Sequence, residues 1–564
     1  MGMNQQEENV MPSASCAIPA RRFDSAWRAA AAGLLMASLF APVEGRAGPL
    51  KVTTDSGPVK GSLVDGVAQF KGIPYAAPPV GKLRWRPPKR PEPWTQVRDA
   101  TEFGPTCLQV TTLGPFAGPP SMEEDCLYLN VYSPNVDPDG KGKLPVIMWI
   151  HGGGNLDGAS NGYDGSKLAR QGHVVVVTIN YRLGLLGFMA HPAIDAEGHP
   201  FANYGILDQQ EAMRWIKRNI AAFGGDKNNV TIGGQSAGSV DSETHVMSPL
   251  AKGLFHRAIY QSVLLEPESL ESAQAKGKAF SVAAGCGSGE DEATARCLRN
   301  LTARQIYDLS GTASTQASYI SSIVQDGKII PGQYLDAIEK GDFNHVPLLS
   351  GTTKDELTFA IGITEYFSGP PRVATSEADF EAAVNSYGGA AYPAGTLKKV
   401  RQFYPLESYP SPGQALNRLL TDPLVCQHRA HNQAYVGKVP IYYYEFADRT
   451  APSIFPKMPG FEPLAYHTGD IQYVFPGWHG GDKGVQHELN AQQEELSDEI
   501  VASWTNFAWT GNPNGQGNRP WPKYSNEPNR PSILSQNVPT SSVISDAQFN
   551  AEHQCDFWES ISHW

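Results

Sequence analysis

Three short runs of almost unbroken apolar residues constrain the fold of this chain more than any other feature. They lie at 144–150 (LPVIMWI), 174–181 (VVVVTINY) and 230–233 (VTIG). A strand with one face in water alternates apolar and polar residues, whereas a strand covered on both faces does not. The apolar residues of 207–223, between the second and third runs, have helical spacing. The sequence therefore predicts an α/β fold with a mostly parallel central sheet and helices on both faces.

Later segments extend this pattern. Further strands are predicted at 347–351 (PLLSG) and 439–446 (VPIYYYEF), and 494–509 is predicted as a helix with one apolar face. The stretches 369–411 and 510–532 are rich in proline and glycine, which interrupt helices and strands, and they are predicted as surface loops. No stretch reads as a linker between two folded domains.

A glycine-flanked serine follows the third apolar run. The segment 234–238 (GQSAG) comes directly after that strand, and 239–247 can begin a helix. A strand, a tight turn and a helix form the context in which Ser236 would expose its hydroxyl as a nucleophile. A second segment of the same pattern, 158–162 (GASNG), has no strand directly before it and is predicted as a loop. Ser236 is therefore the candidate nucleophile.

Three glycines follow the first apolar run, in the segment 151–154 (HGGG). Without side chains, their backbone can approach a substrate carbonyl and direct N–H groups toward it. Such donors stabilise the oxyanion that forms when a nucleophile attacks a carbonyl. We expect these donors to be the N–H groups of Gly153, Gly154 and Ala237. His151 is expected to orient this loop and not to act as the base.

A serine hydroxyl needs a base to become a nucleophile, and that base is usually oriented by an acid. Of the 14 histidines, His467 is the candidate base, because it lies late in the chain in the segment 466–470 (YHTGD). A second acidic segment, KDE, lies at 354–356. From the residues alone, three carboxylates remain candidates for the orienting acid: Asp355, Glu356 and Asp470.

The N-terminal residues and the net charge bear on the protein's location and partners. Arginines precede an apolar run at 29–40, and small residues allow cleavage after Ala47. This pattern predicts a signal peptide at 1–47 and an exported protein, periplasmic or secreted, with one domain at 48–564. The run at 29–40 is too short to span a bilayer, so no transmembrane segment is predicted. The formal net charge of −12 argues against nucleic acid as a partner.

Six of the seven cysteines lie after the predicted cleavage point. An even number in an exported chain suggests disulfides, and six cysteines allow 15 pairings, so counting does not choose among them. No cysteine or histidine spacing suggests a zinc site, so no metal is predicted.

Seven segments of this chain together resemble the type B carboxylesterase/cholinesterase family of α/β-hydrolases, over nearly all of residues 50–564. The matching segments are FKGIPYAAPPVGKLRWRPP (70–88), EDCLYLNVY (124–132), HGGGN (151–155), NYRLGLLGF (180–188), NYGILDQ (203–209), GGQSAGS (233–239) and SPLAKGLFHRAI (248–259). The resemblance implies an α/β-hydrolase fold with large loop and helix insertions around an active-site gorge.

The resemblance also implies an activity and its residues. The activity is the hydrolysis of carboxylic esters, small or polymeric, by a serine esterase that needs no cofactor. Ser236 would form the acyl-enzyme, His467 would act as base, and the family pattern places the acid at Glu356. The cysteines would pair as Cys107–Cys126, Cys286–Cys297 and Cys426–Cys555. An ion pair between Arg84 and Glu124 would anchor the first of these loops.

Departures from the family pattern concern the substrate pocket. The first disulfide loop has no choline-binding tryptophan, and Phe116 is its one aromatic residue. Neutral Gln235 precedes the serine where cholinesterases have glutamate. Both changes remove groups that attract a quaternary ammonium, so choline esters are not expected as substrates. Asn155 replaces the usual phenylalanine after the glycines, which predicts a more polar or reshaped acyl pocket.

Two alternatives to the predicted general carboxylesterase remain open. One is a specialised hydrolase that uses the same chemistry on a polyester, a pesticide or a mycotoxin ester. The other is a non-catalytic interaction protein, because the family contains adhesion proteins that have lost the serine. The intact set of serine, histidine, glutamate and glycines favours an enzyme.

Overall fold

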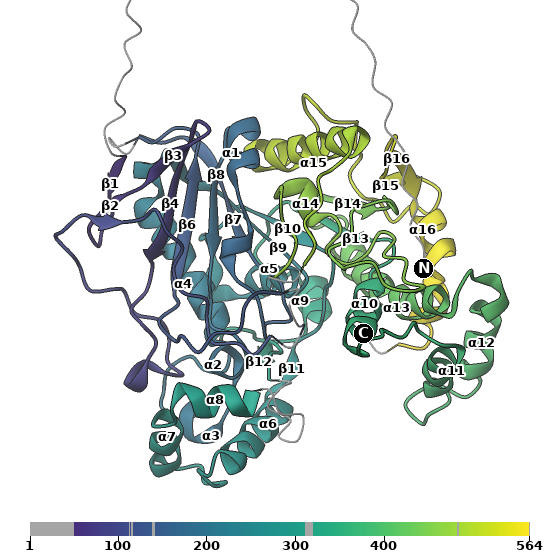
Figure 1. Cartoon of the computed structure of the whole chain (residues 1–564), viewed down its shortest axis with the longest axis horizontal. Coiled ribbons are helices and arrows are strands. Elements are labelled where there is room, and N and C mark those ends of the chain that lie inside the picture. Colours follow the sequence, from purple (N-terminus) through teal and green to yellow (C-terminus); the bar gives the residue numbers. More distant parts are fainter. Residues whose placement is uncertain are drawn as a thin grey trace, which may run out of the picture. The chain divides into compact units, whose positions relative to one another are not determined.

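One sheet of eleven strands runs through the residues that the structure describes (Figure 1). The computed structural model describes residues 50–562 except 112, 114–116, 138–140, 311–319 and 482–483, so the predicted signal peptide at 1–47 lies outside the described residues. The contacts of Pro49–Trp564 make this part of the chain one unit. In spatial order the strands are β16 (Ser542–Ser545), β15 (Pro531–Gln536), β14 (Ile441–Phe446), β13 (Leu348–Thr353), β10 (Arg257–Gln261), β9 (Gly225–Gln235), β7 (Leu144–Ile150), β8 (Val175–Ile179), β6 (Tyr128–Ser133), β4 (Val67–Pro74) and β3 (Ser62–Val64).

The middle of this sheet is parallel, as the apolar runs predict. Neighbouring strands from β15 to β8 in the spatial order all pair in parallel. Antiparallel pairs occur only toward its two ends in the described residues. Two small sheets lie outside it, one of β1 (Lys51–Thr53), β2 (Pro58–Lys60) and β5 (Arg98–Asp99), the other of β11 (Glu268–Ser269) and β12 (Val324–Gln325).

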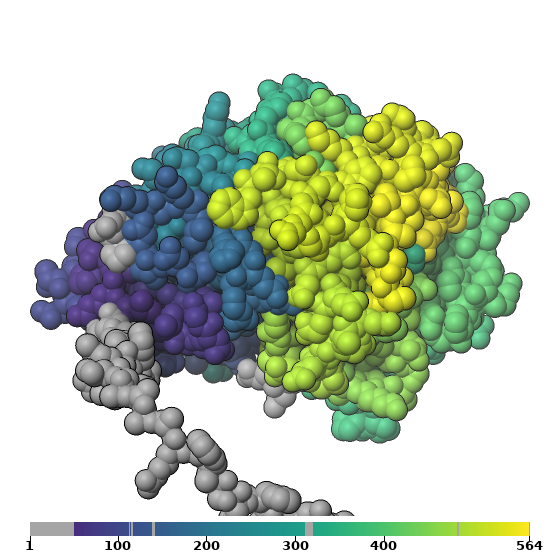
Figure 2. Space-filling model, turned by 90° about the horizontal axis from the view of Figure 1, so that it is seen from above, coloured from purple at the N-terminus to yellow at the C-terminus, as the bar shows by residue number. Residues whose placement is uncertain are grey.

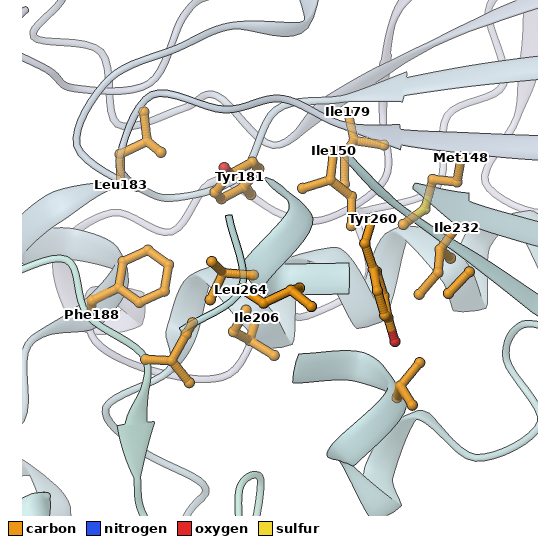
Figure 3. Close-up of a cluster of buried hydrophobic side chains, with 14 of the residues drawn as sticks. Met148, Ile150, Ile179, Tyr181, Leu183, Phe188, Ile206, Ile232, Tyr260 and Leu264 are labelled. Carbon is orange, nitrogen blue, oxygen red and sulfur yellow. The ribbon is translucent and has the colours of Figure 1, made fainter. Parts of the chain in front are cut away.

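Burial on both faces explains the unbroken apolar runs. In β7, Val146, Met148 and Ile150 belong to the larger of the two main core clusters among the described residues, which also contain a third, small cluster. The alternating residues Ile147 and Trp149 belong to the other main cluster. Successive side chains of a strand point to opposite faces, so each face of the sheet has its own apolar core. Figure 3 shows part of the larger cluster, in which Ile150 is drawn between Tyr181 and Tyr260 and Met148 beside Ile232.

Helices cover both faces. On one face, α1 (Ser166–Gly172) and α14 (Ile471–Val474) pack against the long α15 (Ala491–Thr510). Figure 2 shows the yellow-green chain around α15 beside the blue chain that includes α1, and Trp509 donates a hydrogen bond to the Gly172 carbonyl between these two helices. On the other face, α4 (Tyr204–Asn219), α5 (Ala237–Met247) and α13 (Pro412–Tyr435) contact the central strands.

The remaining helices lie in connections between strands or, for the last two, after the last strand. They are α2 (Gly184–Phe188), α3 (Pro192–Asp195), α6 (Leu270–Ala283), α7 (Glu292–Arg299), α8 (Ala303–Ser310), α9 (Tyr334–Lys340), α10 (Thr358–Phe367), α11 (Glu377–Ser386), α12 (Thr396–Phe403), α16 (Asp546–His553) and α17 (Cys555–Glu559), with short 3₁₀ turns at Gly81–Leu83, Ser160–Gly162, Ile220–Phe223, Pro249–Ala251 and Leu406–Ser408. Among the described residues no helix is both long enough and apolar enough to span a bilayer.

The prediction of a surface loop at 369–411 is wrong in part, because α11 and α12 form within it. The side chain of Ser376 caps the first turn of α11, and Asp379 bonds back to the Ser376 N–H. This reciprocal cap satisfies donors at the helix start that are otherwise unpaired. Phe380 and Val400 are buried, which holds the two helices against the body. At 510–532 the prediction is right, since the described residues between α15 and β15 form neither helix nor strand.

Three disulfides join the cysteine pairs that the family resemblance implies: Cys107–Cys126, Cys286–Cys297 and Cys426–Cys555. The implied ion pair is also present, with an Arg84 Nη2 to Glu124 Oε1 distance of 2.5 Å, and both side chains are largely buried. The third disulfide ties α13 to the start of α17 across a separation of 129 residues. It therefore closes by far the longest of the three loops.

Replacing Cys426 and Cys555 together by serine should destabilise the fold without removing any residue of the candidate site. A cross-link across so long a loop restricts the unfolded chain strongly, so the free energy of unfolding should fall by about 2–5 kcal/mol. Guanidinium denaturation of the purified protein measures this change. The matched variant without Cys286–Cys297, whose separation is 11 residues, should lose less stability. An equal or larger loss in that control would contradict the prediction.

Candidate active site

Ser236 occupies a sharp turn between β9, which ends at Gln235, and α5, which begins at Ala237. Its φ of 58° and ψ of −124° lie outside the ordinary regions for residues with a side chain. The flanking glycines make the turn possible, because a Cβ on Gly238 would lie 2.1 Å from the Ile150 carbonyl oxygen. The Ser236 N–H donates to the Gln261 carbonyl at 2.9 Å. The strand therefore presents Ser236 at its carboxyl end, beside the N-terminus of α5.

The glycine loop, residues 151–155, lies against this turn. It follows β7, which pairs in parallel with β9, so both segments leave the sheet at the same edge. A Cβ on Gly152 would lie 3.0 Å from the Cβ of Ser236. Gly153 and Gly154 have positive φ values of 112° and 64°, and the N–H groups of these two residues and of Ala237 donate to no described backbone or side-chain acceptor. Those donors therefore remain available to a substrate oxygen.

Glu356 and His467 come together just beyond the carboxyl end of β13. Glu356 follows β13, and an isolated parallel bridge between Asp355 and Tyr466 brings the two segments together. The His467 Nδ1–H donates to Glu356 Oε2 at 2.5 Å. The other carboxylate oxygen of Glu356 accepts from the Thr353 N–H at 2.7 Å. Both oxygens of the buried carboxylate are therefore held, and the imidazole ring is held with them.

The two rival carboxylates do not bond to the imidazole ring. Asp355 accepts two hydrogen bonds from the Arg449 guanidinium, at 2.8 and 2.9 Å. Asp470 is buried, and desolvation by this burial raises its pKa to about 7, although a hydrogen bond from Gln261 and the nearby His467 oppose the rise. Of the three acids that the sequence leaves open, Glu356 is the one whose carboxylate is hydrogen-bonded to the His467 ring in the described residues.

Gln235 contacts the other nitrogen of His467. Its side-chain amide lies 3.0 Å from His467 Nε2. Because Nδ1 donates to a carboxylate, Nε2 of the neutral ring is the acceptor, and the Gln235 amide donates to it. Within the described chain no hydrogen bond joins the Ser236 hydroxyl to His467. Such bonds are often long in a free site and tighten only when substrate binds.

These groups share a cavity of about 500 Å³. Ser236, His467, Gln235 and the three glycines line it, and its apolar wall includes Tyr163, Phe359 and Trp478. The Phe359 ring centroid is 5.7 Å from that of His467, and those of Tyr163 and Trp478 are 6.2 Å apart. Sequence reasoning missed this wall, because its residues are contributed by three segments far apart in the chain.

Of the three residues predicted to line the substrate pocket, Asn155, Gln235 and Phe116, the structure places only Gln235 at the cavity within the described chain. Gln235 lines the cavity as predicted. Asn155 does not line it; its side chain is buried under the glycine loop, where it bonds to Asp241 and Tyr181. The prediction that Asn155 makes the acyl pocket more polar is therefore wrong. Phe116 lies outside the described residues.

His151 packs against the glycine loop. Its ring stacks on Tyr181 with centroids 4.5 Å apart, and its Nδ1–H donates to the Gly152 carbonyl at 2.9 Å. Burial lowers the His151 pKa to about 4, so the ring is neutral at physiological pH. This position agrees with the prediction that His151 orients the loop.

One group of side chains in the described residues has a spacing that could suit a metal ion: Glu445, Glu552 and His553. Lys354 lies between the two glutamates, 2.6 Å from Glu552 and 3.4 Å from Glu445. His553 bridges Glu445 and Asp422 at 2.8 and 2.9 Å. These groups already pair with one another, and they tie the C-terminal helices to the segment that carries Glu356.

Comparisons with known proteins cover most of the chain. The sequence model described as the carboxylesterase family matches residues 48–558. Para-nitrobenzyl esterase of Bacillus subtilis is 35% identical over 498 residues, which are 86% of this chain and 95% of that protein. The medium-chain fatty acyl-CoA hydrolase precursor of Anas platyrhynchos is 36% identical over 508 residues, 84% of this chain and 86% of that protein.

Solved structures of similar proteins have the same fold. A thermophilic PNB esterase superposes with a TM-score of 0.73 at 32% identity, covering 90% of this chain and 100% of its own. A carboxylesterase of Geobacillus stearothermophilus superposes with a TM-score of 0.72 at 32% identity, covering 90% of this chain and 99% of its own.

Replacing Gly238 by alanine should reduce ester turnover at least about 10²-fold, because its Cβ would displace Ser236 from the glycine loop and misplaced reacting groups lose rate steeply. The initial rate with p-nitrophenyl butyrate measures the effect. Gly162→Ala is the matched control, since its Cβ would make an ordinary 3.7 Å contact with Trp478. A folded Gly238→Ala variant with wild-type turnover would show that the close approach at this turn is not needed.

Asp470 should make the fold less stable as pH rises. Its folded-state pKa of about 7 lies above the ordinary value of 3.8, so between these pH values the folded chain binds more protons than the unfolded chain. The free energy of unfolding should therefore fall with rising pH by up to about 1.4 kcal/mol per pH unit from this group. Urea denaturation of wild type and Asp470→Asn at pH 4.5 to 7.5 tests this. The exposed Asp336→Asn variant is the control, and parallel profiles for wild type and Asp470→Asn would refute the assignment.

Proposed function

The chain belongs to the carboxylesterase family and is a carboxylic-ester hydrolase, and from this premise we propose that Ser236 is its nucleophile, His467 its base and Glu356 the acid that orients the base. The observation that carries the proposal is the 2.5 Å hydrogen bond between Glu356 and His467 Nδ1, in a histidine that lines the same cavity as Ser236. Reaction by an acyl-enzyme follows from these roles.

In the first step the Ser236 oxygen bonds to the ester carbonyl carbon while its proton moves to His467 Nε2. For this to happen the Gln235 amide must release Nε2, which it contacts in the free site. The N–H groups of Gly153, Gly154 and Ala237 bind the oxyanion, and Glu356 stabilises the imidazolium. His467 then protonates the leaving alcohol as its bond to carbon breaks. Water repeats the cycle on the acyl-enzyme and releases the acid.

The cavity favours uncharged esters with apolar or aromatic groups. Its volume of about 500 Å³ suits a small molecule, and Tyr163, Phe359 and Trp478 provide an apolar wall. Gln235 places a neutral amide, with no carboxylate for a cationic alcohol, next to the nucleophile. One relative is named for uncharged esters of this kind, the mouse pyrethroid hydrolase. The specialised alternatives (a polyester, a pesticide or a mycotoxin ester) would use the same residues.

Export is part of the proposal. Removal of residues 1–47 as a signal peptide would leave 48–564 as one catalytic domain in the periplasm or medium. The three disulfides support this destination, because disulfides persist in oxidising compartments and are rare in reducing ones.

Replacing Ser236 by alanine should abolish the hydrolysis of p-nitrophenyl esters, because the acyl-enzyme cannot form. The residual rate should be at least about 10⁴-fold below wild type. Release of p-nitrophenol from acetate to dodecanoate esters measures turnover and sizes the acyl pocket at the same time. Glu356→Gln should also lose rate while still folding. Retained activity in Ser236→Ala would reject Ser236 as the nucleophile.

A further inference from the structure

Asn155 ends the glycine loop and turns its side chain into the protein. Its φ is 57°, and the side chain is 3% exposed. The Asn155 Nδ2 group donates to Asp241 Oδ1 at 3.0 Å, and its Oδ1 accepts from the Tyr181 hydroxyl at 3.1 Å. The Asn155 carbonyl accepts from the Gly184 N–H at 2.7 Å. Both the side chain and the backbone carbonyl of this residue are therefore held.

Asp241 belongs to α5, the helix that begins directly after Ser236. Its carboxylate is fully buried, and its second oxygen accepts from the Gln209 amide at 2.6 Å. The other side-chain atom of Gln209 accepts from His245 Nε2 at 2.7 Å, which fixes the direction of the amide. Burial raises the Asp241 pKa to about 7. The ester hydrolysis described above assigns no role to this costly buried group.

Tyr181 holds the other end of the same loop. Its hydroxyl lies 2.8 Å from the His151 carbonyl oxygen as well as 3.1 Å from Asn155 Oδ1, and its ring stacks on His151. Figure 3 shows Tyr181 within the buried apolar cluster. The glycine loop is thus anchored at its first residue by Tyr181 and at its last by Tyr181 and Asp241 together.

We propose that the hydrogen bond between Asn155 and Asp241 is a positioning clamp, which sets the distance between the two halves of the oxyanion hole. This inference rests on the proposed function. Gly153 and Gly154 belong to the loop after β7, whereas Ala237 is the first residue of α5. The clamp joins these two segments directly. Donors stabilise an oxyanion only when all of them lie at hydrogen-bond distance from the same point, so the spacing of the segments matters for the rate.

Replacing Asn155 by leucine tests the clamp, because leucine has a similar size and no hydrogen-bonding group. The expected result is a fall in kcat of roughly 10- to 100-fold, with KM within about 3-fold of wild type, because the clamp acts on the transition state more than on the bound ester. Affinity for a trifluoromethyl ketone, whose tetrahedral adduct with Ser236 imitates the transition state, should fall by the same factor as kcat/KM.

Two further variants separate positioning from simple folding. Asn219→Leu is the matched control, because Asn219 is also buried and hydrogen-bonded but binds Asp55 at the far end of α4. It should lower the melting temperature without changing kcat. Asp241→Asn is the milder test if Asn155→Leu does not fold, since the amide NH2 that replaces one carboxylate oxygen would face a donor, either Asn155 Nδ2 or Gln209 Nε2. It should lower kcat several-fold, and in combination with Asn155→Leu it should cause little additional loss.

The clamp is rejected if folded Asn155→Leu keeps the wild-type kcat, or if its ketone affinity is unchanged while kcat falls. It is also rejected if Asn219→Leu loses kcat to the same extent. Ser236→Ala in the same assay separates this result from the proposed function. Activity retained in Ser236→Ala removes the nucleophile assignment, whereas loss of activity there with unchanged Asn155→Leu removes only the clamp.

Discussion

The parallel pairing of β7 with β9 is the constraint on which the rest of the site depends. Because Ile150 pairs with Gly234, the glycine loop and the serine turn leave the sheet at the same edge and at the same height. Their backbones come so close that only glycine fits at 152 and 238. β10 and β13 extend the same parallel order, so the Gln261 carbonyl can hold the Ser236 N–H and the segment after β13 can deliver Glu356. A sheet of antiparallel strands would have sent these loops to opposite ends.

Much of this arrangement can be predicted from the sequence, because the spacing of apolar residues and the positions of the glycines determine the strands and turns locally. The runs at 144–150, 174–181 and 230–233 gave the central strands, and the two glycine segments gave the edge where chemistry is possible. The choice among Asp355, Glu356 and Asp470 needed more. It depends on Arg449, which binds Asp355 from a distant part of the chain, and no local pattern reports that contact. The helices α11 and α12 could not be predicted for a different reason, because the cap of α11 and the buried apolar residues of both helices outweighed a local excess of proline and glycine.

Asn155 shows why a substitution against a family pattern is hard to interpret without a structure. In sequence it follows three glycines that lie beside the cavity, so a pocket role is the natural prediction. Its positive φ instead directs the side chain under the loop, toward a carboxylate on the next helix. Asp241 itself looks like any polar residue of a helix in the sequence. Gln235 differs from Asn155, because it lines the cavity although it is largely buried, and its amide contacts His467 Nε2. The two substitutions against the family pattern therefore have different roles: Asn155 is structural, whereas Gln235 faces the cavity.

The chain around His553 has a consequence for synthesis. Lys354 opens the segment that supplies Glu356, and its ammonium pairs with Glu445 and with Glu552. His553 joins that group to α13, and the disulfide at Cys555 fastens it there. All of these late residues leave the ribosome long after the serine turn and the glycine loop have been made. A growing chain thus contains Ser236 well before it contains the residues that hold the segment of Glu356. Under the proposed function, the support of Glu356 is therefore complete only once α16 and α17 have been made and packed.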